Sequence, residues 1–223
     1  MMLTYERAIS FLDNFDAALV VFRKSLLQMI QTSLNVSNRP KCIIVTGRPG
    51  SEKTTLARKL AEQLWVPIIS RDEIKEGYVN TYGVKYDQLP PNTNIVMSNL
   101  FFGIVSQHLA GKISVVIEAA FQHQVWESRI GQIQELGHPF IVVCFIDGLV
   151  AAKRHLQRGL ENPRREFFHG DKRVTIYKET GVLSPPDNYS APDFAVPTIK
   201  VSTAGEYTPC IDYIMNMIQP SDT

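Results

Sequence analysis

Apolar residues follow two different patterns along this chain of 223 residues. Over residues 4–34 they recur every three or four positions with no Gly or Pro, which predicts an amphipathic helix, or two helices that break at Asp13-Asn14. From residue 41 onward, short runs of consecutive apolar residues alternate with segments of helical spacing. We therefore predict an N-terminal helical extension over residues 1–38 and an α/β domain over residues 39–223.

Five segments of the α/β region have the composition of strands that are buried on both faces of a parallel sheet. They are CIIVT (42–46), VPIIS (66–70), ISVVIEA (113–119), FIVVCFI (140–146) and TIKVS (198–202). Gly111, Gly137 and Gly181 stand where the intervening helices should end. Repeated β-α units predict a three-layer α/β fold, in which ligands bind at the carboxyl ends of the strands.

The apolar stripe of the N-terminal segment is broad, because extra apolar residues such as Ile9, Val20 and Ile30 widen it. A face of this width favours packing on the chain's own domain over a narrow coiled-coil seam. Homodimerisation through the N-terminal helix stays open as the alternative.

Composition narrows the class of protein and of partner. The formal net charge of +1 gives no overall field that would gather polyanions, so nucleic acid is not expected as a partner. No apolar run reaches the roughly 18 residues that span a membrane, and the N-terminus lacks the basic start and apolar block of a signal peptide. Cys42, Cys144 and Cys210 have no partner at metal-ligand spacing, which indicates core thiols in a reducing compartment. We expect a cytoplasmic protein.

The stretch CIIVTGRPGSEKTTLARKLAEQL, residues 42–64, carries the most specific chemical signal. A strand enters a Gly/Pro turn and then an apolar-periodic helix, an order that aims backbone N–H groups and a helix N-terminus at one point. Such an anion cradle suits phosphate, with Lys53 reaching the outer phosphates and the Thr54 hydroxyl helping to hold Mg²⁺. The candidate nucleotide-binding residues of the loop are Gly47, Gly50, Ser51, Glu52, Lys53, Thr54 and Thr55. A tight turn with an exposed lysine is the alternative.

Glu52 departs from the pattern G-x-x-x-x-G-K-[ST], which has its second glycine at this position. A glutamate adds bulk and a negative charge beside an anionic ligand. Like charges about 4 Å apart repel by roughly 4 kcal/mol at an effective dielectric near 20, which corresponds to about a thousandfold loss in affinity. The loss shrinks if the side chain turns to solvent or pairs with Arg48 or Lys53. We expect weakened nucleotide binding.

Further segments add to this signal: IISRDEIKE, VVIEAAF, an Arg-rich stretch from 153 to 165, and VPTIKVSTAGEYTP. With GRPGSEKTTLARKLAEQL they make residues 41–219 resemble the P-loop kinases, in particular the AAA-type ATP-binding "predicted kinase" group related to zeta toxins and chloramphenicol phosphotransferase. The phosphate loop is the specific part of this resemblance. The resemblance implies a P-loop kinase fold with a five-stranded parallel sheet. It also implies transfer of the γ-phosphoryl group of ATP to a hydroxyl of a small molecule, with Mg²⁺.

The resemblance assigns roles to two acids at strand ends. Asp72 falls where relatives carry the catalytic carboxylate that accepts the proton of the substrate hydroxyl. Acids are also favoured in a first helical turn, and Ser70 and Glu73 would form a capping box around Asp72. Glu118 occupies the position of the Walker B acid, which holds a Mg²⁺-bound water. An ion pair with Lys or Arg at the sheet end is the alternative for Glu118.

The stretch VAAKRHLQRGLENPRREFFHGDKR resembles an Arg-rich lid, over about residues 150–181. The resemblance implies that Arg158 acts in catalysis and that Arg154, four residues earlier on the same helix face, binds the nucleotide. A solvated basic face is the alternative. Thr203, in a segment that resembles the lining of an adenine pocket, is a further candidate for nucleotide binding. Residues 78–94 either shape the acceptor site or form a surface loop.

Three functions are compatible with these residues. The first is a small-molecule kinase, the second is a non-catalytic P-loop protein with a binding or regulatory role, and the third is a polynucleotide-end kinase. The near-neutral charge and the lack of a basic-aromatic stripe disfavour the third. The presence of both Asp72 and Glu118 favours the first over the second, because a disabled site has no need of these acids.

Overall fold

The computed structural model describes residues 20, 22–25, 39–186 and 188–219. Two compact units divide the chain, residues 1–39 and residues 40–223. In the first unit, residues 20 and 22–25 are described and are helical. The rest of the predicted helix over 4–34, and the homodimer that it could form, lie outside the described residues. The second unit holds the alternating strands and helices.

Five strands of the second unit form one parallel sheet in the order β2-β3-β1-β4-β5. The strands are β1 (Lys41–Gly47), β2 (Ile68–Ser70), β3 (Val115–Glu118), β4 (His138–Phe145) and β5 (Thr198–Ser202). The predicted α/β fold with a five-stranded parallel sheet is therefore confirmed. β2 is shorter than predicted and begins after Pro67, whose nitrogen has no hydrogen to donate to a neighbouring strand. Because β1 lies at the centre, the loop after β1 opens where the strand order reverses.

Helices connect the strands and close both faces of the sheet. They are α2 (Lys53–Leu64), α3 (Arg71–Tyr82), α4 (Thr93–Ala110), α5 (His123–Leu136), α6 (Gly148–Glu161), α7 (Arg164–His169), α8 (Arg173–Thr180) and α9 (Ile211–Ile218), with a 3-10 helix η1 (Tyr86–Gln88) after α3. As predicted, Gly111, Gly137 and Gly181 directly follow α4, α5 and α8. No helix within the described residues is long and apolar enough to cross a membrane.

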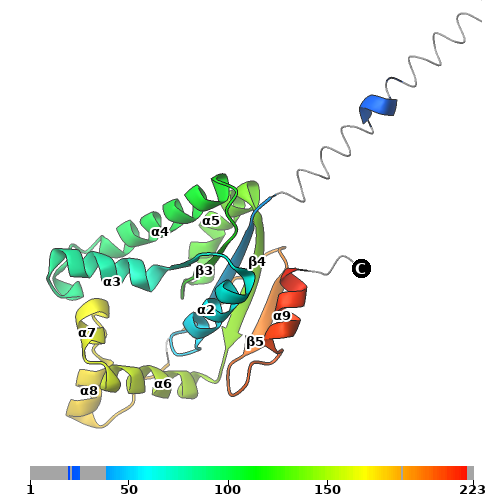
Figure 1. Ribbon diagram of the computed structural model, residues 1–223. Helices are drawn as coiled ribbons and strands as arrows, with labels where there is room; N and C mark the ends of the chain where they lie inside the picture. Colours follow the sequence, from blue (N-terminus) through cyan, green and yellow to red (C-terminus); the bar gives the residue numbers. More distant parts are fainter. Residues whose placement is uncertain (1–19, 21, 26–38, 187, 220–223) are drawn as a thin grey trace, which may run out of the picture. The chain divides into compact units, whose positions relative to one another are not determined.

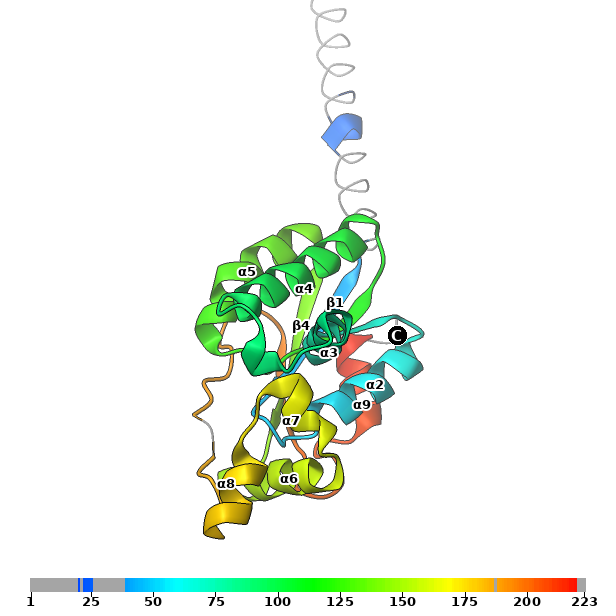
Figure 2. The same cartoon turned by 90° about the vertical axis from the view of Figure 1, so that its left-hand side faces the viewer.

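Alternate residues of β1 supply the two faces of the sheet. Cys42 and Ile44 pack in a cluster with α4 and α5, whereas Ile43 and Val45 pack in a second cluster with α2 and α9. Figure 2 shows the resulting layers, with α4 and α5 on one side of β1 and β4 and with α2 and α9 on the other. The two isoleucines are at most 1% exposed, and burial of each such side chain contributes roughly 1.5–3 kcal/mol.

The three cysteines differ in their surroundings. Cys42 and Cys144 are buried in the sheet, as expected, and burial raises the pKa of the Cys144 thiol to about 12. Cys210 is exposed, so the expectation of a core thiol was wrong there. The physical reason is its position as the residue that precedes α9, outside the turns of that helix that pack on the sheet.

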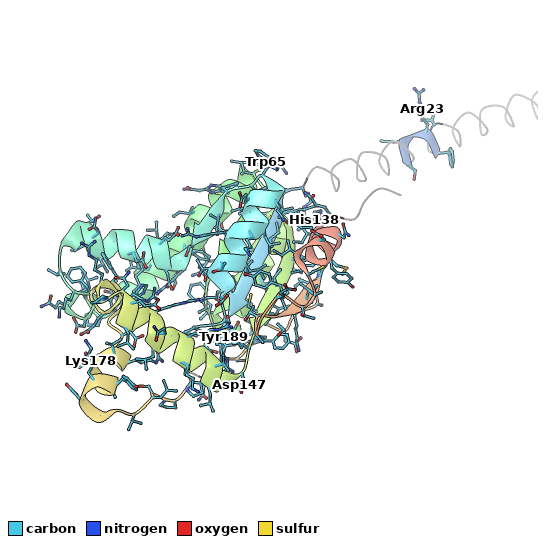
Figure 3. The ribbon with its side chains drawn as sticks, turned by 60° about the horizontal axis from the view of Figure 1, so that its bottom comes forward. Arg23, Trp65, His138, Asp147, Lys178 and Tyr189 are labelled. Atoms are coloured by element: carbon cyan, nitrogen blue, oxygen red, sulfur yellow. The ribbon has the colours of Figure 1, made fainter. Side chains whose placement is uncertain are left out.

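Helices α6, α7 and α8 gather at the carboxyl end of the sheet, below the other helices in Figure 1. Helix α7 packs against α3 and η1, and α8 packs against α6. The chain then returns past the end of β1, where Tyr189 lies (Figure 3). The Tyr189 hydroxyl donates to Thr46 Oγ1 at 2.8 Å, because Thr46 itself donates to the Ala119 carbonyl. Burial raises the pKa of Tyr189 to about 12, so this hydroxyl keeps its proton.

Candidate nucleotide site

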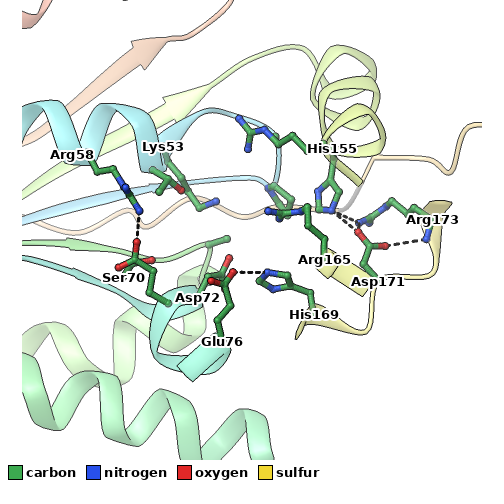
Figure 4. A pocket seen from close by; sticks show the side chains of 16 residues that line it. Lys53, Arg58, Ser70, Asp72, Glu76, His155, Arg165, His169, Asp171 and Arg173 are labelled. Atoms are coloured by element: carbon green, nitrogen blue, oxygen red, sulfur yellow. Dashed lines mark hydrogen bonds and ion pairs between the residues drawn. The ribbon is translucent and has the colours of Figure 1, made fainter. Parts of the chain in front are cut away.

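A cleft of about 470 Å³ lies between the N-terminus of α2, helix α3 and the helices α6–α8 (Figure 4). Its lining residues are Pro49, Gly50, Lys53, Thr54, Arg58, Ser70, Asp72, Glu73, Glu76, Ala120, His155, Arg158, Arg165, His169, Asp171 and Arg173. Most of these side chains are ionisable, and both signs of charge are present. The cleft is therefore suited to a charged or strongly polar ligand.

Two glycines allow the loop after β1 to pack tightly against the rest of the domain. A Cβ on Gly50 would lie 2.2 Å from the backbone oxygen of Ala151, and a Cβ on Gly47 would lie 2.5 Å from that of Cys144. Gly50 also has φ +85°, a backbone conformation that residues other than glycine rarely adopt. These positions hold the loop close to α6 and β4.

The N-terminus of α2 is open towards the cleft. No side chain caps this helix and no acidic residue occupies its first turn, so its first N–H groups are left for a ligand or for water. Lys53 and Thr54, the first two residues of α2, line the cleft. By contrast, Asp147 caps α6 and accepts hydrogen bonds from the N–H groups of Leu149 and Val150 at 2.9 and 3.1 Å. Its backbone geometry and its dipole make the open end of α2 a candidate anion site.

Glu52 adopts the conformation that favours glycine. Its φ and ψ are 57° and 19°, in the left-handed region, which costs a side-chain-bearing residue roughly 1–2 kcal/mol. Its carboxylate does not line the cleft but lies 3.5 Å from Arg154 Nη1. Arg154 was not among the alternatives that the sequence left open for Glu52, namely solvent, Arg48 or Lys53, and α6 brings Arg154 alongside the loop. The loop thus keeps its shape, and the charge of Glu52 is turned away from the anion site.

Arg154 ties three parts of the domain together. Besides Glu52, it contacts the segment after β5, donating to the Thr203 oxygen at 2.8 Å and to the Ala204 oxygen at 3.3 Å. Thr203 is 1% exposed, and its hydroxyl donates to the Phe145 oxygen at 3.4 Å. Arg154 and Thr203 therefore lie outside the cleft, and their predicted role in nucleotide binding stays a prediction.

Lys53, which lines the cleft, forms a buried ion pair with Glu118, which does not. Lys53 Nζ lies 3.4 Å from Glu118 Oε1, and the Ser70 hydroxyl donates to Glu118 Oε2 at 2.8 Å. Glu118 is 1% exposed, so its carboxylate is removed from water. The ion pair with Lys53 and the hydrogen bond from Ser70 offset the cost of that burial. The capping box expected at α3 is wrong, because Ser70 bonds Glu118 and Glu73 pairs with Arg58.

Asp72 faces the anion site from the first turn of α3. Burial would raise the pKa of this carboxyl, but neighbouring positive charges outweigh burial and hold the pKa below its ordinary value. The cations are Lys53 on α2, His169 at the end of α7, and Arg71 and Lys75 on α3. Asp72 is therefore a carboxylate at neutral pH, able to accept a hydrogen bond and a proton from a hydroxyl group.

The lid side of the cleft contains side chains that the sequence did not single out. His155 and Arg173 converge on Asp171, at 2.5 Å from His155 Nε2 and 3.3 Å from Arg173 Nη1, and His169 reaches across to Glu76 at 2.8 Å (Figure 4). A weak sequence signal did exist. Two of these residues flank a glycine in FFHGDKR, residues 167–173, within the predicted Arg-rich lid.

The cleft brings together part of the predicted site. Gly50, Lys53, Thr54, Asp72 and Arg158 line it. The candidates that do not line it are Gly47, Ser51, Glu52, Thr55, Arg154, Thr203 and Glu118. Ser51 is fully buried, and its hydroxyl has no hydrogen-bond partner among the described residues. The functional role of each candidate stays a prediction.

Solved structures of similar fold include several kinases. A candidate kinase from Chloroflexus aurantiacus aligns with a TM-score of 0.62 at 23% identity, covering 80% of this chain and 93% of that chain. A sugar kinase from Janibacter sp. aligns at 0.52 and 12% identity, covering 80% and 94%. A gluconokinase from Sinorhizobium meliloti aligns at 0.50 and 18% identity, covering 81% and 92%. At these identities the likeness shows the fold alone.

A search among curated proteins found no match to the chain. The sequence model of one family, described as "AAA domain", matches residues 42–174, a stretch from β1 to the second residue of α8. The match covers the open N-terminus of α2, the two acids at strand ends and most of the lid. The chain therefore belongs to the AAA domain family and has the fold of a P-loop kinase.

Proposed function

We propose that the chain is an ATP-dependent phosphotransferase that transfers the γ-phosphoryl group to a hydroxyl of a small molecule. The observation that carries this proposal is the opposition of two groups in one cleft. The uncapped N-terminus of α2, with Lys53, offers an anion site, and the Asp72 carboxylate faces it from α3. The resemblance to the group of zeta toxins and chloramphenicol phosphotransferase stays a prediction within this proposal.

The donor set of the cleft fits Mg²⁺ bound together with a nucleotide. The described residues contain no cluster of three or more His, Cys, Asp or Glu side chains that could hold a metal by themselves. Mg²⁺ suits such a site, because it keeps several waters and takes phosphate oxygens as ligands. Thr54, which lines the cleft, would hold the ion directly, whereas Glu118, which lies behind Lys53 and bonds Ser70, would act only through water. The ion, when bound, would neutralise charge on the transferring group.

Each cleft residue then has a task. Asp72 orients the acceptor hydroxyl and takes its proton, while Lys53 stabilises the negative charge on the phosphates. Arg158 and Arg165 reach the cleft from the lid, and neither forms an ion pair within the described residues. Two guanidinium groups without carboxylate partners are available for the charge that spreads over phosphoryl oxygens during transfer.

The lining also points to a class of acceptor. Pro49 and Ala120 are its apolar members, and none of the described lining residues is Phe, Tyr or Trp. An aromatic acceptor would find no ring to stack on, whereas paired acids and bases offer alternating hydrogen-bond acceptors and donors. We infer a polar acceptor with several hydroxyl groups.

Because Glu52 stands where the phosphate-loop pattern has glycine, a second function is also considered, that of a P-loop protein that binds or regulates without catalysis. Its ion pair with Arg154 holds a side chain where a glycine would leave space. We propose that nucleotide binding is weakened rather than lost, because the carboxylate lies outside the cleft.

Thermal shift with Mg·ATP tests the proposal. We expect a shift for the natural chain and a larger one for Glu52→Gly. Asp72→Asn should keep the shift and lose ATP turnover, because it retains the anion site and removes the base. Absence of a shift in both the natural chain and Glu52→Gly would overturn the kinase and leave the non-catalytic protein.

A further inference from the structure

The end of α7 is fastened to α3 by two polar contacts. His169 Nε2 lies 2.8 Å from Glu76 Oε1, and the His169 side chain is only 12% exposed. The ammonium of Lys75 donates to the backbone oxygen of the same histidine at 3.4 Å. Both partners on α3 lie within one turn of Asp72, so the lid meets α3 beside that carboxylate (Figure 4).

Lys75 also holds the 3-10 helix η1. Its Nζ lies 3.8 Å from the centre of the Tyr86 ring, and the residue is 6% exposed. A cation over an aromatic face is held more strongly where water is excluded. Gly170, with φ +66°, permits the lid to approach the same ring, because a Cβ there would lie 2.9 Å from Tyr86 Cδ1. Helix α3, η1 and the lid therefore meet around one buried ammonium.

Asp171, the residue after Gly170, connects the lid to α6. Asp171 accepts hydrogen bonds from His155 Nε2 at 2.5 Å and from the backbone N–H of Arg173 at 3.0 Å. Burial would raise the pKa of Asp171, but His155 and Arg173 hold that pKa well below its ordinary range. Residues 169–171, which we call the lid corner, thus join α3 to α6, the helix that carries Arg158.

We propose that Lys75 is a positioning residue, which holds the lid corner on α3 and thereby sets the separation of Asp72 from the lid arginines. The proposal rests on the proposed phosphoryl transfer, in which both sides act on one phosphoryl group. Small displacements of such groups are costly, because catalysis by positioning depends on the near-attack geometry. Lys75 itself does not line the cleft.

The charges around Lys75 give this role a pH dependence. Burial and Arg71 lower the pKa of Lys75 to about 8, against the opposing effect of Asp72, Glu76 and Asp171. His169 and Tyr86 are the other titratable groups that face it, from the lid and from η1. Lys75 loses its charge as pH rises through about 8, and because burial in the closed lid corner lowers this pKa, deprotonation favours the closed lid corner over an opened one in which Lys75 would be exposed.

Limited trypsin digestion of the full chain without nucleotide tests the contact directly. The lid offers cleavage sites at Arg164, Arg165, Lys172, Arg173 and Lys178. At pH 7 we expect Lys75→Met to speed cleavage there about tenfold and Lys75→Arg to stay near the natural rate. Lys59→Met is the matched control, because Lys59 lies over the Tyr207 ring at 5.1 Å on the exposed face of α2. Unchanged lid cleavage in Lys75→Met, or equal acceleration throughout the chain, overturns the proposal.

Hydrolysis of Mg·ATP, with water in place of the acceptor, separates positioning from a purely structural role. Lys75 is one of the cations that lower the pKa of Asp72, so its removal raises that pKa. The acid limb of the pH profile in Lys75→Met should move to higher pH, and an unmoved limb would contradict the proposal. If the natural chain and Glu52→Gly show neither a Mg·ATP thermal shift nor hydrolysis, phosphoryl transfer fails, while the digestion still decides whether Lys75 holds the lid.

Discussion

The two sides of the cleft are built in different ways. The loop side uses backbone N–H groups from one short stretch, residues 47–55, and two glycines shape it. The lid side uses side chains from α3, α6 and α7, which are joined by hydrogen-bonded acid–base pairs. A site made of backbone N–H groups depends on the backbone conformation. It tolerates a side chain in place of glycine if that side chain points away from the site, as Glu52 does. A site made of side chains depends on each partner, and one substitution leaves an opposite charge without its counterpart.

The largest effect is expected at Lys53, whose side chain pairs with the buried Glu118 at the end of β3. Lys53→Met leaves the buried Glu118 carboxylate with only the Ser70 hydroxyl, and we expect a loss of about 3 kcal/mol in unfolding free energy. Arg58→Met removes a partner of Glu73 from an exposed pair in the same cleft and should cost less than about 1 kcal/mol. Urea unfolding measures both. Equal losses would show that burial does not set the strength of these pairs.

Gly50→Ala tests whether backbone shape controls the loop side. The new Cβ would meet the Ala151 oxygen at 2.2 Å with φ at +85°, so we expect a loss of about 2 kcal/mol and a loss of the Mg·ATP thermal shift. Gly77→Ala, in the interior of α3 with open space around it, should instead stabilise by about 1 kcal/mol. A Gly50→Ala protein that binds Mg·ATP normally would contradict the dependence on backbone shape.

Asp171→Asn tests the side-chain network of the lid through pH. The pKa of Asp171 is lower in the folded chain than in the unfolded chain, so its contribution is present above the ordinary pKa near 3.8 and is lost as pH falls through the folded value. We expect the substitution to cost about 1–2 kcal/mol at pH 7 and progressively less as pH falls below about 3.8 toward the folded value, by urea unfolding at a series of pH values. The same cost at every pH would mean that charge plays no part.

The same division decides what the sequence could predict. The parallel sheet and the phosphate loop depend on local patterns, namely apolar runs and the spacing of Gly47, Gly50 and Lys53, and the sheet was predicted with only small errors in strand ends. The lid network depends on pairs such as His169 and Glu76, which lie 93 residues apart, and one sequence does not show such pairs.

The capping box at α3 failed for the same reason. The motif around Ser70 was present, but the tertiary fold offered its hydroxyl a buried carboxylate, which is the stronger partner. The partner of Glu52 was likewise missed, because Arg154 lies far from Glu52 along the chain and is brought to it by the fold. Local patterns predict backbone geometry, whereas the choice among polar partners is made by the fold.

The smallest effects on stability and on Mg·ATP affinity are expected at Glu52, where substitutions test most directly whether the loop side depends on backbone or on side chains. Glu52→Gln removes the charge but keeps a side chain on a backbone in the left-handed conformation. Glu52→Gly removes the side chain as well, and with it the backbone strain. The stability of Glu52→Gly should stay within about 1 kcal/mol of the natural chain, because the relieved strain offsets the lost Arg154 pair and the greater freedom of the unfolded glycine. Because the carboxylate lies outside the cleft, we expect calorimetry with Mg·ATP to give a few-fold gain in affinity for Glu52→Gly and little gain for Glu52→Gln. An equally large gain in both would mean that the charge is felt at the phosphates after all. In that case the loop side depends on side chains as much as the lid does.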